Sequence, residues 1–279
     1  MPKLAVSNIA LTAFDHQAEL GRLSGLGLAG LEVAPSRIWH DTWHGLKPRQ
    51  VEAYRRQVED AGLRVVGLHS LFWDRPGLGL FRGADVRATT LDFLVHLSRV
   101  CADLGGRTLI YGSASARRRG GLPLADANAE AIDFFAALAR RTGADETCFC
   151  FEPLGPDEAD FINSAFDALA IVEAVDSPSL RMQLDAKALV ANDEVAPATF
   201  RAAAPFLVHF HANEPGLVAL GDSGRMDHAL LGRLLREIGY EGYVSIEQRL
   251  LNESDPVCDV ARSAAVLREH YGGPEGRSG

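Results

Sequence analysis

Short apolar runs alternate with longer amphipathic stretches along nearly the whole chain. Each run is six or seven residues long, and many are bounded by glycine, proline or polar residues. This length and these boundaries are typical of β-strands. The pattern therefore predicts strands at residues 4–10, 29–34, 64–70, 107–113, 147–153, 181–186, 207–213 and 243–249.

The stretches between these runs have the hydrophobic periodicity of helices. Residues 51–62 (VEAYRRQVEDAG) end on a glycine, which suits a helix stop. The alternation of strand and helix predicts parallel βαβ units, and eight such units close into a single α/β (β/α)₈ TIM barrel. A doubly wound sheet is the alternative, although no G-x-G-x-x-G follows the first strand. Further helices are predicted at residues 86–106, 128–143, 166–175, 200–206, 228–239 and 260–271.

Polar and bulky apolar residues alternate within the later predicted strands. In residues 147–153, Cys150 and Glu152 share one face, whereas Phe149 and Phe151 share the other. The bulky apolar face of a barrel strand packs against the helices. The polar faces are therefore predicted to line the barrel axis.

Four consecutive predicted strands each place a titratable side chain on the inward face near the carboxyl end, where barrel enzymes carry their chemistry. Uncompensated charges in a barrel interior cost several kcal/mol each, so this set is not a stabilising device. Three carboxylates and one imidazole suit a single divalent ion such as Mg²⁺, Mn²⁺, Co²⁺ or Zn²⁺. The alternative is a set of scattered surface residues or of salt-bridged residues, and the apolar strand around the aspartate disfavours the surface version. The four residues are Glu152, Asp185, His211 and Glu247.

The amino-acid composition limits the kinds of binding partner that we expect for this protein. The 28 basic and 37 acidic residues give a net charge of −9, which disfavours a nucleic-acid partner. The chain contains no run of about 18 apolar residues, so we expect no membrane-spanning helix. The first residues resemble no secretion signal, so we expect a cytoplasmic protein with reduced cysteines. We expect the barrel to span residues 1–271 and residues 272–279 to be disordered.

Six motifs, in this order along the chain, resemble the xylose isomerase-like TIM-barrel superfamily of sugar and sugar-phosphate isomerases and epimerases. The resemblance implies that Glu152, Asp185, His211 and Glu247 bind a catalytic divalent metal, and that the two glutamates move protons to and from a substrate carbon. The same fold also hosts dehydratases of inososes and dehydroshikimate and a DNA-repair endonuclease, so fold alone does not fix the reaction. The motifs are GLAGLEVA (27–34), VVGLHS (65–70), CFCFEPLG (148–155), MQLDAKAL (182–189), VHFHANEPG (208–216) and GYEGYVSIEQR (239–249).

The chain departs from the ketose 3-epimerases of that superfamily at two positions. These enzymes commonly carry a histidine three residues after the sixth-strand aspartate, where this chain has Ala188. They also commonly carry an arginine shortly after the seventh-strand histidine, where this chain offers Leu217. A free-ketose epimerase is therefore one option among several.

Six further residues are candidates for substrate binding because they lie on inward faces or in loops at the carboxyl end. Each also has a structural alternative: His69 could be a packing residue, Glu32 could pair with Arg249, and the loop tryptophan could fill the loop or a subunit interface. Residues 117–119, three consecutive arginines, are expected to be solvated. The six candidates are His69, Glu158, Lys187, Arg249, Glu32 and Trp73.

Lys187 continues the inward face just past Asp185, and a compact ammonium there could grip a substrate hydroxyl, carboxylate or phosphate. The alternative is an ion pair with Asp193 or Glu214 that only shapes the loop.

The sequence predicts an isomerase or epimerase that removes a proton next to a carbonyl through a metal-stabilised enediolate. Glu152 and Glu247 are the expected catalytic residues, and one divalent metal ion is the expected cofactor. The expected partner is a small carbohydrate, with neither nucleic acid nor membrane, and a homo-oligomer is left open. Two alternatives stand beside this hypothesis: a metal-dependent dehydratase of a keto-polyol, and a non-catalytic sugar-binding barrel.

Overall fold

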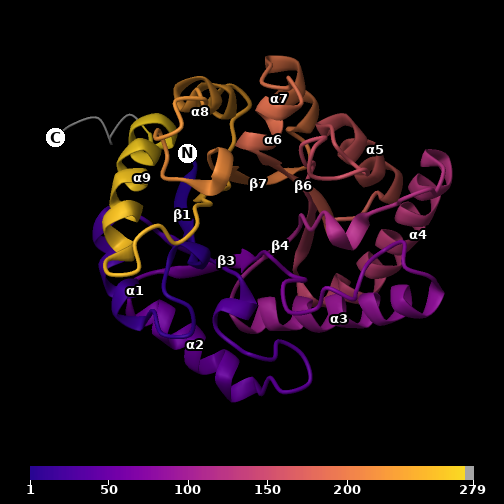
Figure 1. The fold of residues 1–279 in the computed structure, drawn as a ribbon, viewed down its shortest axis with the longest axis horizontal. Coiled ribbons are helices and arrows are strands. Elements are labelled where there is room, and N and C mark those ends of the chain that lie inside the picture. Colours follow the sequence, from indigo (N-terminus) through magenta and orange to yellow (C-terminus); the bar gives the residue numbers. More distant parts are fainter. Residues whose placement is uncertain (274–279) are drawn as a thin grey trace.

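Eight parallel strands close into a barrel in the order of the sequence, β1 to β8, as the alternation predicts (Figure 1). In this computed structural model every strand is paired with its neighbours in the sequence, and β1 pairs with β8 to complete the ring. The strands are β1 Lys3–Ser7, β2 Gly30–Val33, β3 Arg64–Leu68, β4 Thr108–Tyr111, β5 Cys148–Phe151, β6 Leu180–Asp185, β7 Leu207–Ala212 and β8 Tyr243–Ile246.

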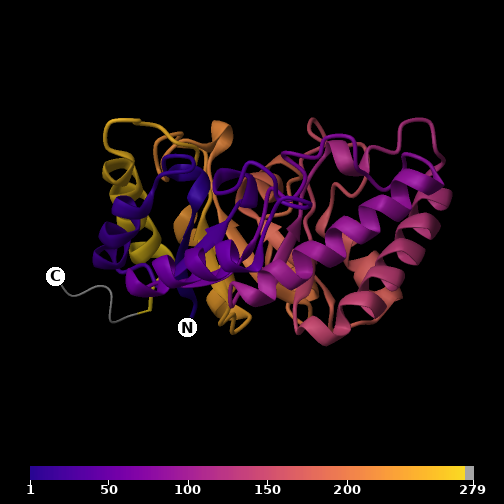
Figure 2. The same cartoon turned by 90° about the horizontal axis from the view of Figure 1, so that it is seen from below.

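The α-helices form an outer ring around the strands (Figure 1). Seen from the side, the N-terminus lies at one end of the barrel, and the connection between β8 and the last helix arches over the opposite end (Figure 2). The helices are α1 Gln17–Leu23, α2 Pro48–Asp60, α3 Ala84–Asp103, α4 Leu124–Thr142, α5 Ala165–Val175, α6 Ala186–Ala191, α7 Pro197–Ala203, α8 His228–Glu237 and α9 Pro256–Tyr271.

The structure describes residues 1–273, so most of the predicted disordered tail (274–279) lies outside the described residues. None of the helices within this part of the chain combines the length and apolar character needed to cross a membrane.

Two helices were not predicted from the sequence. Helix α1 is too short for a clear periodic pattern, and α6 follows directly on β6, because Asp185 ends the strand and also caps the helix. The first strand is shorter than predicted, since residues Asn8–Ala10 form a 3₁₀ turn. The last strand also ends early, at Ile246, and this displaces Arg249 from the predicted inward face.

The bulky apolar residues of the later strands face the helices. Phe151 of β5 packs against Phe135 of α4, with ring centroids 4.8 Å apart. Phe210 of β7 lies between Phe200 of α7 and Tyr271 of α9, at 6.4 and 5.9 Å. These contacts leave the polar residues of the same strands to fill the barrel interior.

Candidate metal centre and substrate pocket

The four titratable side chains of the predicted metal set meet at the carboxyl end of the barrel. Glu152 directly follows β5, Asp185 ends β6, His211 lies near the end of β7 and Glu247 directly follows β8. Glu152, Asp185 and His211 are buried, and the Glu247 side chain is 17% exposed. β5 to β8 are neighbours in the barrel, so the four side chains at their carboxyl ends lie close together.

The three carboxylates surround one imidazole nitrogen. His211 Nδ1 lies 3.5 Å from Glu152 Oε1, 3.5 Å from Glu247 Oε2 and 3.8 Å from Asp185 Oδ2. One ligand atom from each of Glu152, Asp185 and His211 lies within 4.8 Å of the others. Within residues 1–273, none of the three carboxylates forms an ion pair with a lysine or arginine. A buried carboxylate cluster of this kind needs a cation, and its donor set fits a divalent metal.

The second nitrogen of His211 is held by a glutamate from the far side of the barrel. His211 Nε2 lies 3.1 and 3.0 Å from the two carboxylate oxygens of Glu32, which also accepts a hydrogen bond from Ser245 Oγ at 2.9 Å. Metal-binding histidines usually donate their other ring N–H to such an acceptor. Glu32 therefore turns Nδ1, which lies 3.0 Å from Gln183 Nε2, toward the carboxylates as the ligand atom. Its partners are His211, Ser245 and His209, whose Nε2 lies 3.1 Å from Glu32 Oε1, so the alternative of a pair with Arg249 is wrong.

Two amide side chains orient the carboxylates. Asn213 Nδ2 donates to Asp185 Oδ2 at 2.5 Å and to Glu247 Oε2 at 2.8 Å. Gln183 Nε2 donates to Glu152 Oε1 at 2.5 Å, while Gln183 Oε1 finds no hydrogen-bond partner in the described chain. Neither role was predicted from the sequence. Each amide lies two residues from a ligand candidate on the same strand face, and that spacing is the signal that could have found it.

A glycine makes room for the Glu152 carboxylate. A Cβ atom added at Gly112 would lie 1.5 Å from Glu152 Oε2, so a larger residue there must displace the carboxylate. Gly112 directly follows β4, which is paired with β5. The close approach of the carboxylate to the backbone therefore requires glycine at this position.

The environment separates the pKa values of the two glutamates. Burial raises the pKa of Glu152 above its ordinary value, and repulsion from Asp185 and Glu247 adds to this although His211 opposes it. Burial also acts to raise the pKa of Glu247, but attraction to His211 and to His69 lowers it below its ordinary value. One carboxyl group therefore holds a proton more readily than the other.

The remaining predicted residues are distributed around this centre. His69 is buried just past β3, with Nδ1 3.7 Å from Glu247 Oε1 and Nε2 2.5 Å from Ser7 Oγ. Trp73 borders the pocket and is exposed. Arg249 is also exposed, and the structure does not bring it to the centre.

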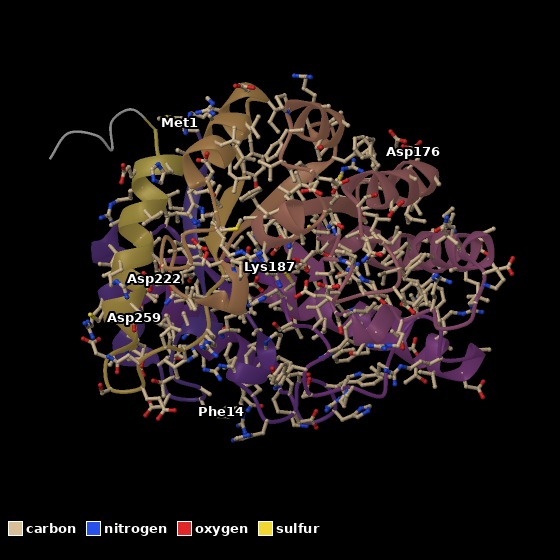
Figure 3. The ribbon with its side chains drawn as sticks, turned by 45° about the horizontal axis from the view of Figure 1, so that its top comes forward. Met1, Phe14, Asp176, Lys187, Asp222 and Asp259 are labelled. Atoms are coloured by element: carbon tan, nitrogen blue, oxygen red, sulfur yellow. The ribbon has the colours of Figure 1, made fainter. Side chains whose placement is uncertain are left out.

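Lys187 forms an ion pair with Glu158, with Nζ 2.5 Å from Oε1. In Figure 3, Lys187 lies near the middle of the molecule, whereas Phe14 and Asp176 lie at its edge. The alternative pairing of Lys187 with Glu214 is wrong, because Glu214 is buried against His228 at 3.0 Å. The observed pair instead bridges the β5–α5 loop and the start of α6.

Arg117 is fully buried, which corrects the expectation of three solvated arginines. Its Nη1 donates to the main-chain carbonyl of Glu152 at 2.5 Å, and its guanidinium lies 5.3 Å from the centre of the Phe151 ring. The neighbouring Arg118 is exposed as expected. Three consecutive arginines in the sequence do not show which of them the folded loop buries.

A cavity of about 460 Å³ opens from this centre toward the solvent. Three of the four predicted metal ligands line its inner end. The size falls in the range of ordinary small-molecule sites, about 300–1,000 Å³. The chain therefore carries a charged centre at the base of a pocket large enough for a small organic ligand.

Comparison with known proteins gives matches over most of the chain. A family model described as "Xylose isomerase-like TIM barrel" matches residues 20–270. D-psicose 3-epimerase of Ruminiclostridium cellulolyticum is 30% identical over 118 residues, which is 42% of this chain and 39% of that protein. The sequence match thus spans about two fifths of the relative's length.

Solved structures share the fold over nearly the full length. D-psicose 3-epimerase from Clostridium cellulolyticum, solved with D-tagatose, superimposes with a TM-score of 0.79 at 18% identity, covering 96% of this chain and 99% of that one. A 3-keto-D-glucoside 4-epimerase from E. coli superimposes with a TM-score of 0.80 at 19% identity, covering 96% and 100%.

Proposed function

The chain belongs to the xylose isomerase-like TIM-barrel family, and on this premise we propose that it is a metal-dependent epimerase of a keto sugar. The observation that carries the proposal is the meeting of three carboxylates on His211 Nδ1 at the base of a pocket. The relatives named as D-psicose 3-epimerases support the reaction class.

Glu152, Asp185, His211 and Glu247 would hold one divalent ion. When bound, such an ion supplies Lewis-acid polarisation of the substrate carbonyl. Glu32, Asn213 and Gln183 fix the directions of the ligand atoms through the hydrogen bonds described above.

The two glutamates divide the proton chemistry. One of Glu152 and Glu247 would remove a proton from the carbon next to the carbonyl, and the other would return a proton to that carbon. β5 and β8 are separated by two strands in the barrel, so the two carboxylates approach the substrate from different directions.

Three other residues complete the proposed substrate site. His69 lines the inner pocket beside Glu247 and can hold a substrate oxygen. Lys187 and Glu158 are paired with each other and can exchange that pairing for contacts to substrate hydroxyl groups. Glu32 is fully buried behind His211 and therefore supports the metal ligand rather than the substrate.

The proposal is tested by incubating the Mn²⁺-loaded protein with a panel of ketoses in D₂O. We expect one epimer to convert to another with one deuterium at the inverted carbon. Loss of water from the substrate would indicate a dehydratase instead. Conversion without deuterium incorporation would contradict the two-glutamate scheme.

A further inference from the structure

The pocket has two chemically different halves. Its inner half carries the titratable groups of the proposed metal centre. Its outer half is formed by the β3–α3 loop on one side and by the end of β4 with its following loop on the other. The outer lining includes Ser70, Phe72 and Trp73 on the first side and Ser113 and Ser115 on the second.

The most exposed large apolar side chain of the described residues stands in this outer half. Trp73 is 80% exposed, although it borders a pocket. An indole has a large apolar face that is costly to leave in water, and tryptophan is enriched at binding interfaces for this reason. Trp73 therefore offers a flat apolar platform at the pocket mouth.

The loop that carries Trp73 is braced on both sides. Phe72 is buried against Phe93 and Tyr111, with ring centroids at 6.1 and 5.5 Å. On the other side, Asp74 accepts a hydrogen bond from Thr42 Oγ1 at 2.8 Å. The indole is thus presented by a loop whose neighbouring residues are fixed, as a preorganised contact requires.

The wall formed by the β4–α4 loop supplies hydroxyl groups. Ser113 and Ser115 lie with their Oγ atoms 3.2 Å apart, and Ser115 is exposed to solvent. Hydroxyls that bond only weakly to each other remain able to donate to a ligand and to accept from it.

The absence of charged side chains limits the kinds of ligand that the outer half of the pocket can bind. Over residues 1–273, no lysine, arginine, aspartate or glutamate lines the outer half. A phosphate or carboxylate is normally held by arginine or lysine, or by a helix N-terminus. The outer half is therefore built for an uncharged group.

We propose that the outer half binds an uncharged second ring, so that the substrate is a keto sugar carried as a glycoside rather than as a phosphate. This inference rests on the proposed epimerase function. The keto sugar lies at the charged inner end, the second ring stacks on Trp73, and its hydroxyl groups bond to Ser113 and Ser115. A free monosaccharide would leave the Trp73 platform uncovered.

Three sugars that share one keto unit test this assignment: fructose, fructose 6-phosphate and 6-O-α-D-glucopyranosyl-fructose. Their dissociation constants are measured by calorimetry on the Mn²⁺-loaded protein. We expect the glucosyl derivative to bind at least about tenfold more tightly than fructose, and the phosphate to gain no affinity. Trp73→Ala should abolish the gain from the second ring without changing the affinity for fructose. Phe14→Ala, at another exposed aromatic residue that does not line the pocket, should leave all three affinities unchanged.

Other outcomes would contradict the second-ring site. Equal affinity for fructose and its glucosyl derivative, or tightest binding of the phosphate, would refute the second-ring site while leaving the epimerase proposal standing. If none of the three sugars binds, the second-ring site for a fructosyl glycoside is refuted, and the ketose panel in D₂O decides the proposed function. If Trp73→Ala converts a dimer to a monomer in light scattering, the indole belongs to an interface between copies and the substrate assignment is wrong.

Discussion

The imidazole of His211 lies between Glu32 and the three carboxylates of the proposed metal centre, with Nε2 3.0 Å from Glu32 Oε2 and Nδ1 on the other side. This arrangement makes Glu32 the acceptor that selects the tautomer of His211. The buried Glu32 carboxylate also increases the basicity of the ring.

We expect Glu32→Gln to weaken Mn²⁺ binding by about 10- to 100-fold, the usual cost of losing such a partner. Calorimetric titration of the metal measures the effect directly. Glu269→Gln, at an exposed glutamate of α9, is the control and should bind Mn²⁺ as the wild type does. Unchanged affinity in Glu32→Gln would show that Glu32 does not orient the ligand.

Glu152→Gln and Glu247→Gln should each reduce kcat by about 10²–10⁴-fold, the usual contribution of a general acid or base. The amide keeps the shape of the side chain but cannot exchange a proton. The wash-in of solvent deuterium then separates the two roles. The variant that lacks the base should lose exchange at the substrate carbon, whereas the variant that lacks the acid should keep exchange but lose inversion. Full turnover in either variant would exclude that residue from proton transfer.

Gly112→Ala should disable the centre because its Cβ would lie 1.5 Å from Glu152 Oε2. A displacement of about 1 Å at a reacting group can cost about 10²-fold in rate. Gly143→Ala is the matched control, since an added Cβ there meets no atom within 4 Å and its backbone is helical. The comparison requires kcat and Mn²⁺ affinity for both variants, with circular dichroism to confirm folding.

If the Lys187 ammonium holds the substrate, Lys187→Met should raise KM or lower kcat by at least about tenfold. This change corresponds to a loss of about 1.4 kcal/mol in binding of the substrate or the transition state. Its melting temperature and metal content should stay unchanged, because the Lys187–Glu158 pair is partly exposed and such pairs contribute little stability. Lys3→Met, at an exposed lysine of β1, controls for the loss of positive charge. Lower thermal stability with normal kinetics would assign Lys187 to loop structure.

We expect His16 to make the stability of the fold depend on pH. Burial lowers its pKa below the ordinary value near 6.5, and the ring hydrogen bonds to Thr12 O at 2.8 Å and to Tyr54 Oη at 2.7 Å. Between the lowered folded pKa and about pH 6.5, the unfolded chain binds more protons than the folded one. The free energy of unfolding therefore falls as the pH decreases through this window, by up to about 1.4 kcal/mol per pH unit for this one group.

Urea unfolding of the wild type and His16→Gln at several pH values between 5 and 8 measures this effect. The stability difference in favour of the wild type should be larger at pH 7.5 than at pH 5.5. A difference that is independent of pH would show that His16 has the same pKa in both states.

Much of this architecture follows from local patterning. The alternation of strands and helices predicted the barrel and its eight strands. The period of two in residues 147–153 and in the later strands predicted which side chains face the axis, because successive residues of a strand must point to opposite faces. The same rule placed Glu152, Asp185 and His211 on the inward face before any tertiary contact was known.

Tertiary structure decided the features that depend on where strands end and on which groups meet across the barrel. Arg249 lies off the inward face because β8 stops at Ile246, and alternation constrains only the residue directly after a strand end. The partner of Glu32 lies 179 positions away, on β7. The burial of Arg117 and the exposure of Trp73 follow from loop packing rather than from residue type. Sequence pattern thus fixes the face on which a strand residue lies, but closure of the barrel and its loops determines which groups that residue contacts.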